Sequence, residues 1–173
     1  MIRPVTSNDA DAIAAIYEPL VLESHVSFET DPPGIVEIRS RMSQSHAWIV
    51  DEEGGVVRGY AYAHKLHDRP AYLWSTEVSV YVAEGHRAAG VGKPLLDALL
   101  QLLLERGFVN AFALIALPNA ASVRLFESAG FELVGVCQSA GYKLGRWHDV
   151  TWWQRGLNDP TFPPPALLDT EGE

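Results

Sequence analysis

The sequence predicts one domain of the α/β (α+β) class, because about seven strand-like segments and about four helix-like segments share the chain. Residues 73–106 carry the strongest signal: a β-branched and aromatic strand, a glycine-containing loop, and a long apolar helix that stops at Gly107. Residues 47–63 indicate two strands around a glycine turn. Residues 131–153 indicate a long antiparallel pair joined through Gly141 and Gly145. Together these segments predict a mixed, mostly antiparallel sheet covered by helices.

The composition limits the classes of function. The 173 residues are 47% hydrophobic and 20% charged, which is typical of a globular domain with a sizeable core. A net charge of -9 argues against a nucleic-acid partner. The single cysteine, Cys137, excludes an internal disulfide and is expected to be a small core residue. Because residues 1–25 lack a signal-peptide pattern and the apolar runs are short, we expect a cytoplasmic protein with no membrane partner.

The first part of the chain predicts two helices and three strands. Thr6 supplies a capping side chain at the start of the first helix, and Pro19 inside the helical pattern predicts a kink or a break. The expected elements are a strand at 2–5, a helix at 6–20, a helix at 32–42, and strands at 47–50 and 56–63.

Residues 64–70 form a polar loop, His-Lys-Leu-His-Asp-Arg-Pro. We expect no metal here, because no third imidazole or thiolate lies at ligand spacing nearby. Arg69 is better interpreted as an anion contact, because a guanidinium binds an acidic group in a bidentate manner. A solvated surface charge is the alternative for Arg69.

Strict alternation along the strand at 73–82 assigns its side chains to two faces. One face carries Tyr72, Trp74, Thr76, Val78 and Val80, and the other carries Leu73, Ser75, Glu77, Ser79 and Tyr81. A carboxylate in the middle of an apolar strand needs a reason. Glu77 is either a catalytic group or half of a buried ion pair, with Arg69 or Arg146 as partner.

The loop at 85–92 and the helix at 92–106 predict an anion site. Helix N-terminal N–H groups carry partial positive charge, and Gly90 and Gly92 let a ligand approach the backbone. Arg87 and Lys93 add full charges, so a pyrophosphate would fit. The pattern is neither a P-loop nor GxGxxG. An ordinary strand–loop–helix crossover is the alternative.

The remaining segments complete the predicted fold. Residues 108–116 form a nearly continuous apolar strand that predicts burial on both faces. A helix follows at 119–129 with Gly130 as its stop. We divide the chain into a domain at 1–157 and a Pro-rich, acidic tail at 158–173, which lies on the surface or is disordered.

Four separated motifs occur in one order along the chain. They are Trp74-Ser75-Thr76-Glu77, Arg87-x-x-Gly90-x-Gly92, the segment Leu117–Phe131, and Gly141-Tyr142-Lys143-Leu144-Gly145-Arg146-Trp147-His148-Asp149-Val150. The glycine loop and the Asn-capped helix that ends in Gly-Phe resemble the GNAT N-acetyltransferase superfamily. The first and last motifs resemble its phosphinothricin/methionine sulfoximine acetyltransferase branch. The resemblance covers roughly residues 1–157.

This resemblance implies a GNAT fold, with a twisted sheet of about seven strands, about four helices and two splayed strands that bind acetyl-CoA. One of these strands carries a bulge in the family. The cofactor-binding residues it implies are Val80, Tyr81, Val82, Arg87, Ala88, Ala89, Gly90, Val91, Gly92, Lys93 and Asn119. The pantetheine arm would pair with the splayed strand as an extra strand does. For Asn119 a plain helix N-cap is the alternative, and both roles are compatible.

The resemblance also implies a direct transfer in a ternary complex. Glu77 would handle the amine proton, directly or through a water. GNAT enzymes often carry Tyr, and this branch often His, at the position of Phe126, which cannot donate a proton. The thiolate then leaves unaided, or His148 or Tyr142 protonates it. A structural hydrogen bond is the alternative role for His148.

The implied acceptor is the α-amine of phosphinothricin, methionine sulfoximine or methionine sulfone. The acceptor-binding residues we expect are Phe28, Arg69, Tyr72, Trp74 and Val78. Phe28 would lie over the acceptor in a homodimer; packing at the core edge is its alternative. Two further functions remain open: acetylation of another amine (a polyamine, an antibiotic or a protein N-terminus), and a non-catalytic acyl-CoA sensor.

Overall fold

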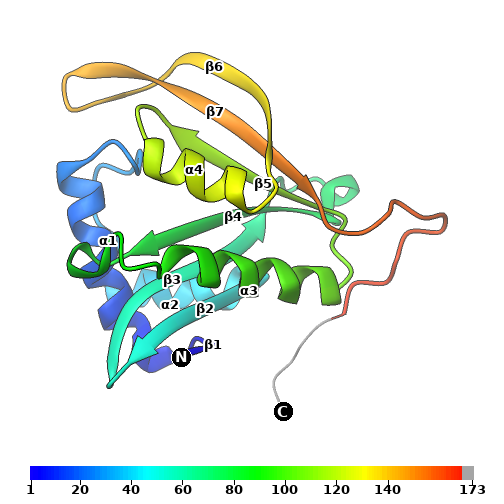
Figure 1. Cartoon of the computed structure of the whole chain (residues 1–173), viewed down its shortest axis with the longest axis horizontal. Helices are drawn as coiled ribbons and strands as arrows, with labels where there is room; N and C mark the ends of the chain where they lie inside the picture. The colour runs from blue at the N-terminus through cyan, green and yellow to red at the C-terminus, as the bar shows by residue number, and fades with distance from the viewer. Residues whose placement is uncertain (169–173) are drawn as a thin grey trace.

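One seven-stranded sheet organises the protein, and the predicted α/β class with a mixed, mostly antiparallel sheet is confirmed (Figure 1). In the computed structural model, residues 1–168 are described. The strands are β1 (Ile2–Pro4), β2 (Ala47–Glu53), β3 (Val56–Lys65), β4 (Ser75–Val82), β5 (Asn110–Ala116), β6 (Glu132–Lys143) and β7 (Arg146–Gly156). The α-helices are α1 (Ala10–Glu23), α2 (Ile35–Gln44), α3 (Gly92–Glu105) and α4 (Ala120–Ser128).

The sheet divides between β4 and β5. Its order is β1-β2-β3-β4-β5-β7-β6, and β4–β5 is its parallel pair. That pairing ends at Glu77 and Phe112, after which β4 continues to Val82 without further pairing to β5. The predicted splay is therefore present, and Glu77 lies where the two strands diverge. The expected bulge is absent from the β3–β4 ladder, whose register is unbroken from Gly59 to Lys65.

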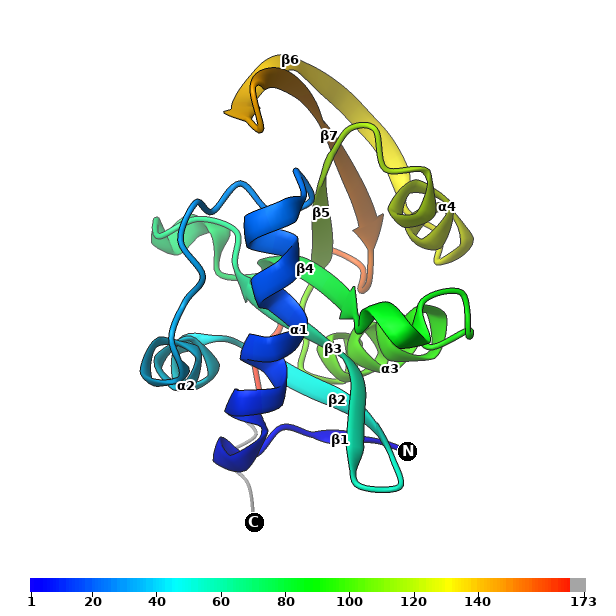
Figure 2. The ribbon, with the colours of Figure 1, turned by 90° about the vertical axis from the view of Figure 1, so that its left-hand side faces the viewer.

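Helices cover both faces of the sheet. Figure 2 shows α1 and α2 on one side, and α3 and α4 on the other. The α3 side holds the larger core, because leucines at helical spacing on α3, such as Leu95, Leu99 and Leu103, are fully buried against the sheet. The α1 side holds an aromatic cluster in which Trp48 stacks on Tyr60. The two clusters pack on opposite faces of β4: Val78 belongs to the α3-side core, and Tyr81 packs against the aromatic cluster.

The start of α1 is fixed by a capping box. Thr6 and Asp9 cap each other across a short 3-10 turn, and the Arg3 guanidinium donates to both carboxylate oxygens of Asp9. Hydrogen bonds from Arg3 lower the pKa of Asp9 to about 2. The helix then runs through Pro19 to Glu23, so of the two predicted outcomes the break is wrong and the kink stays a prediction. Buried residues on both sides of Pro19 compensate for the hydrogen bond that proline cannot make.

Three local expectations are corrected by the structure. Burial along β5 alternates: Ala111, Ala113 and Ile115 face the α3-side core, whereas Leu114, on the other face, is exposed. The strand β6 continues across Gly141 to Lys143, and the turn of the final hairpin lies at Leu144 and Gly145, both with positive φ. Cys137 is exposed on this hairpin, outside the core.

The segment that follows β7 lies along the surface as far as residue 168. Asn158 donates to the carbonyls of Leu104 and Phe108 and so caps the end of α3. Farther on, Trp74 Nε1 donates to the carbonyl of Pro165 at 2.7 Å. The expected acidic end at 169–173 lies outside the described residues, and the boundary at residue 157 stays a prediction. Over residues 1–168, no helix has the length and apolar character to cross a membrane.

Candidate active site

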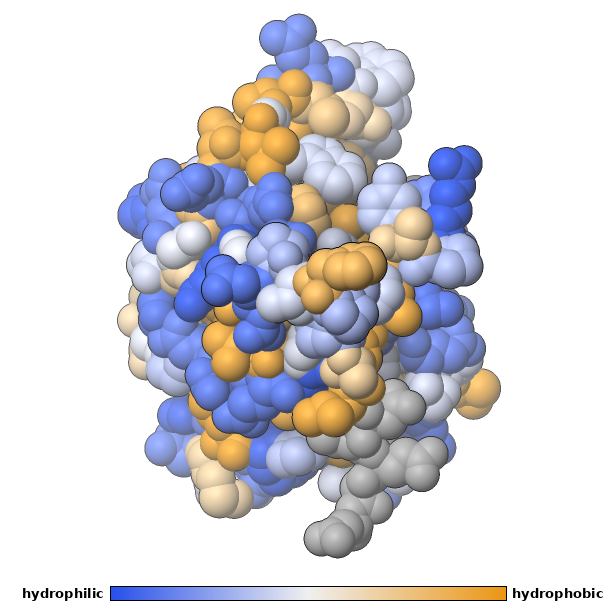
Figure 3. Space-filling model, turned by 90° about the vertical axis from the view of Figure 1, so that its right-hand side faces the viewer, coloured by the Kyte–Doolittle hydropathy of each residue, from blue (hydrophilic) through white to orange (hydrophobic). Residues whose placement is uncertain are grey.

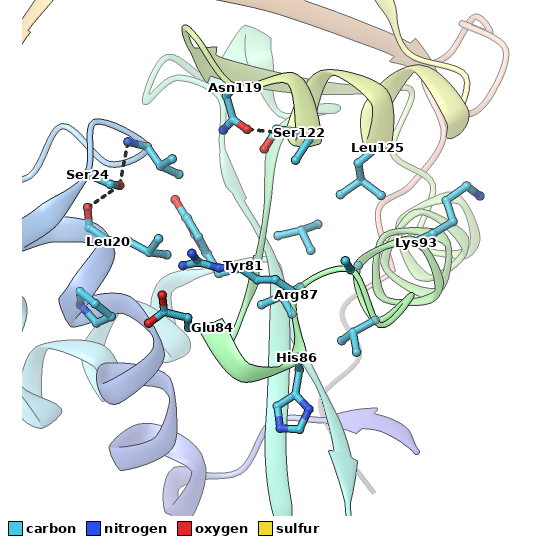
Figure 4. Close-up of a pocket in the computed structure, with 18 of the residues that line it drawn as sticks. Leu20, Ser24, Tyr81, Glu84, His86, Arg87, Lys93, Asn119, Ser122 and Leu125 are labelled. Carbon is cyan, nitrogen blue, oxygen red and sulfur yellow. Dashed lines mark hydrogen bonds between the residues drawn. The ribbon is translucent and has the colours of Figure 1, made fainter.

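A cleft of about 640 Å³ opens between the end of β4, the start of α3 and the start of α4 (Figure 4). Its opposite wall is the last turn of α1 and the segment that follows. The residues that line it are Pro19, Leu20, Glu23, Ser24, Val26, Val80, Tyr81, Val82, Glu84, His86, Arg87, Ala88, Gly90, Val91, Gly92, Lys93, Asn119, Ala121, Ser122 and Leu125. Ten of the eleven residues predicted to bind the cofactor are in this set; Ala89 is not.

One end of the cleft suits an anion. The helix α3 begins at Gly92, and no side chain caps its first N–H groups. Ala88 and Gly90 have φ values of 62° and 77°, which curl the loop in front of the helix. For Ala88 this left-handed conformation costs about 1 kcal/mol, and such strain gathers at functional loops. The end of the cleft thus combines free donors with a tightly bent backbone.

The two predicted cationic side chains behave differently. Figure 4 shows Arg87 extending into the cleft toward Tyr81, and Lys93 pointing away along α3. Lys93 forms an ion pair with Asp97 one turn later. Arg87 is therefore the side-chain charge available to a diphosphate here.

The other end of the cleft suits an amide-bearing arm. Val80, Tyr81 and Val82 line it from the part of β4 that has no strand beside it on the β5 side. Asn119 caps α4 by accepting from Ser122 N at 3.1 Å, which leaves its amide nitrogen as a donor. The predicted cap is confirmed, and a ligand contact by the same side chain stays compatible with it. These features fit a long ligand with a diphosphate at one end and an amide chain at the other, as coenzyme A has.

Glu77 lies at the apex of the splay, paired with a histidine. His64 is directly opposite Glu77 in the β3–β4 ladder, and its Nε2 lies 3.8 Å from Glu77 Oε1. Burial raises the pKa of Glu77, and the His64 imidazole acts in the opposite direction. Arg69 and Arg146, the partners the sequence suggested, are both exposed and make no ion pair with it.

The groups considered for protonating the leaving sulfur are poorly placed for that role. Phe126 is buried in the core, edge-on to Phe131. His148 is also buried, with Nδ1 3.0 Å from the Leu117 carbonyl and Nε2 3.2 Å from the Lys143 carbonyl. This geometry favours the structural role of His148, and its catalytic role stays a prediction. Tyr142 is exposed on the hairpin, against Trp147.

Phe28 packs on the final hairpin of its own chain. A Cβ built on Gly141 would overlap the Phe28 ring, so the ring lies directly on the glycine backbone. His148 lies on its other side, at 6.2 Å between ring centroids. This is the core-edge packing that the sequence left open, although the ring remains partly exposed. Gly141 is needed here because any side chain would displace Phe28.

Sequence reasoning missed a buried polar network that holds the segment after α1. Lys143 Nζ donates to the carbonyls of Val21 and Ser27, each at 2.6 Å. Burial lowers the pKa of Lys143. Glu29 joins the same segment to α2 through Arg41, whose two nitrogens donate to its carboxylate at 2.7 and 3.0 Å. No local sequence pattern predicts these contacts, because Lys143 is more than a hundred residues away from its partners along the chain.

The predicted acceptor-binding residues are only partly brought together. Val78 is buried in the α3-side core, and the tail covers the indole nitrogen of Trp74. Both therefore have structural partners in place of the expected acceptor. Arg69 and Tyr72 lie exposed in the turn that leads into β4. Their acceptor contacts stay predictions.

Comparison with known proteins agrees with this geometry. The family described as Acetyltransferase (GNAT) domain matches residues 2–152. A phosphinothricin N-acetyltransferase of Streptomyces viridochromogenes is 40% identical over 98% of this chain and 94% of its own. An L-methionine sulfoximine/L-methionine sulfone acetyltransferase of Salmonella typhimurium is 32% identical over 94% and 97%.

A solved structure has the same fold together with the ligand that the cleft suits. It is a GNAT superfamily phosphinothricin acetyltransferase from Sinorhizobium meliloti in complex with acetyl-CoA, with a TM-score of 0.88 and 34% identity over 91% of this chain and 88% of that one. The cleft, the splayed strands and these relatives lead to one conclusion: the chain belongs to the GNAT acetyltransferase family.

Proposed function

We propose that this protein transfers the acetyl group of acetyl-CoA to the α-amine of a small amino-acid-like acceptor, of the phosphinothricin, methionine sulfoximine or methionine sulfone type. One observation carries the proposal. The cleft, which includes the uncapped α3 terminus, is lined by the part of β4 that has no partner on its β5 side. Glu77, a half-buried carboxylate, lies where that part of β4 begins. The names of the relatives support the acceptor class.

Each part of the cleft has a distinct task in this proposal. The α3 terminus and Arg87 hold the diphosphate. Backbone N–H groups of Val80 to Val82 align the arm and polarise the acyl carbonyl, and acetyl-CoA supplies an activated thioester. Glu77 accepts a proton from the acceptor ammonium, which frees the nitrogen lone pair for attack. Because Phe126 cannot donate a proton, the thiolate leaves unaided and takes its proton from solvent; His148 or Tyr142 is the alternative donor.

Thiol release from acetyl-CoA tests the acceptor class. We expect turnover with phosphinothricin, methionine sulfoximine and methionine sulfone, and background rates with spermidine and a short alanine peptide. Turnover on spermidine or the peptide alone would assign the enzyme to another amine. No thiol release with any of the five amines, while acetyl-CoA still binds, would favour the non-catalytic sensor.

We also propose that the protein is cytoplasmic and forms a homodimer. In this dimer two copies associate through β6. This strand is a sheet edge, and its exposed apolar residues include Leu133, Val134 and Val136. Figure 3 shows apolar side chains gathered at the end of the molecule where Figure 1 places β6 and β7. An exposed apolar edge invites pairing with a second chain. Recovery of the protein outside the cytoplasm on cell fractionation would contradict the location.

Light scattering tests the association. We expect the mass of a dimer for the parent protein and of a monomer for Val134→Glu, because a charge on the shared edge must be desolvated. Val36→Glu is the matched control, since Val36 is an exposed valine on α2, away from β6. A monomeric parent would refute the dimer.

A further inference from the structure

His64 and Glu77 form an isolated pair across the β3–β4 ladder. They are directly opposite each other, with 3.8 Å between Nε2 and Oε1. The Glu77 side chain is 23% exposed and the His64 side chain 37%. The histidine is thus the more exposed member of the pair. A closure of about 1 Å would bring the pair to charge-assisted hydrogen-bond distance.

The hydrogen bond at the other ring nitrogen fixes how this pair holds its proton. His64 Nδ1 lies 2.9 Å from the carbonyl of Lys65. A carbonyl only accepts, so Nδ1 carries a hydrogen and donates it. In the neutral imidazole, Nε2 is then a lone pair aimed at a carboxylate oxygen. Nε2 can therefore accept a proton that reaches Glu77, and the resulting imidazolium and carboxylate attract each other.

The surroundings leave His64 as the basic partner of Glu77. The Tyr62 ring stacks on the imidazole at 5.6 Å between centroids. Burial lowers the pKa of the half-buried His46, and His64 is close enough to lower it further. Across the sheet, Phe112 of β5 is the residue opposite Glu77 and carries no charge.

Farther away, Glu29 and Arg41 form an ion pair with each other. The pKa of the Tyr62 hydroxyl is raised by burial, and both charges act on it, in opposite directions. Burial raises the pKa of Glu77, with the His64 imidazole as the opposing influence. Among the described residues, no Lys or Arg forms an ion pair with Glu77.

We propose that His64 is a positioning residue that accepts the proton from Glu77 and then releases this proton to solvent. The proposal rests on the proposed function, in which Glu77 receives the amine proton. First an N–H bond of the acceptor ammonium breaks and an O–H bond forms on Glu77. That O–H bond then breaks as an N–H bond forms on His64 Nε2. Finally the imidazolium releases the proton to water, and the pair returns to its starting state with no change of oxidation state.

The pH profile of His64→Gln tests this role. Without the cationic partner, burial alone acts on Glu77, so its pKa rises and the acid limb of kcat/KM moves to higher pH. At neutral pH we expect kcat/KM to fall about tenfold, less than the 10²- to 10⁴-fold typical of a general acid–base group itself, because Glu77 remains in place. His67→Gln is the matched control, because His67 is an exposed histidine in the following loop. If His64→Gln fails to fold, His64→Asn replaces it.

A second readout does not need turnover. In protein labelled with carbon-13 at glutamate carboxyl groups, the resonance absent from Glu77→Gln identifies Glu77. We expect its titration midpoint to be higher in His64→Gln than in the parent. An unchanged midpoint, together with superimposable pH profiles, would refute the proposal while leaving acetyl transfer intact. Absence of turnover in the parent itself would instead refute the proposed function.

Discussion

Glu77→Gln lowers kcat/KM for the amine acceptor by about 10²- to 10³-fold, the range expected when a general base is removed. Glutamine keeps the shape of the side chain but cannot accept the proton. In the parent, activity needs the ionised carboxylate, which is present above its raised pKa and lost as pH falls through it. The acid limb should therefore disappear in Glu77→Gln. Thiol release measured across pH gives both quantities, and the dissociation constant of acetyl-CoA should not change.

A matched substitution separates this effect from a general loss of charge. Glu53→Gln makes the same change at the exposed end of β2, where Glu53 pairs with Arg58. We expect parental kinetics for Glu53→Gln. Full activity in Glu77→Gln would exclude Glu77 as the base and would move the proton to a water held by the backbone.

Lys143→Met lowers the free energy of unfolding by about 3 kcal/mol, the cost of leaving two buried carbonyls without their donor. Lys143 joins the end of α1 to the final hairpin through the carbonyls of Val21 and Ser27. Methionine fills a similar volume, so the change mainly removes the hydrogen bonds. The segment that it releases carries Phe28, so we also expect the acceptor KM to rise while the acetyl-CoA KM changes little. Urea unfolding and initial rates measure these effects.

The control for this change is Lys65→Met, at an exposed position near the end of β3. It makes the same chemical substitution without touching a buried carbonyl, and stability should change by less than about 0.5 kcal/mol. Equal stability of Lys143→Met and the parent would mean that water satisfies the two carbonyls. The network would then not hold the segment in place.

The sequence predicted those parts of the fold that depend on local spacing. The Arg87 to Gly92 loop, the apolar stripe of α3 and the cap at Asn119 are each encoded within a few residues, and all three occur as expected. The alternation along β4 was also correct, and Glu77 and Val78 do face opposite sides. What alternation cannot give is which side faces the core, so Val78 was expected at the acceptor and lies in the core.

Contacts between distant segments could not be predicted from the sequence. The partner of Glu77 depends on the register of β3 against β4, which places His64 opposite it. The burial of Lys143 depends on the hairpin folding back over the end of α1. The cover over Trp74 depends on the path of the tail. None of these contacts has a periodic signal, and the contacts of Lys143 define one of the two predictions with the largest effects.

The most direct test of acetyl transfer to an α-amine is the position of the acetyl group in the product. Methionine sulfone is incubated with the protein and acetyl-CoA that carries carbon-13 in its carbonyl, and the mixture is followed by NMR. We predict that the label appears in an amide bonded to the α-nitrogen, with one free thiol released for each amide formed. Label that stays in the thioester, or that appears only as free acetate, would contradict the account.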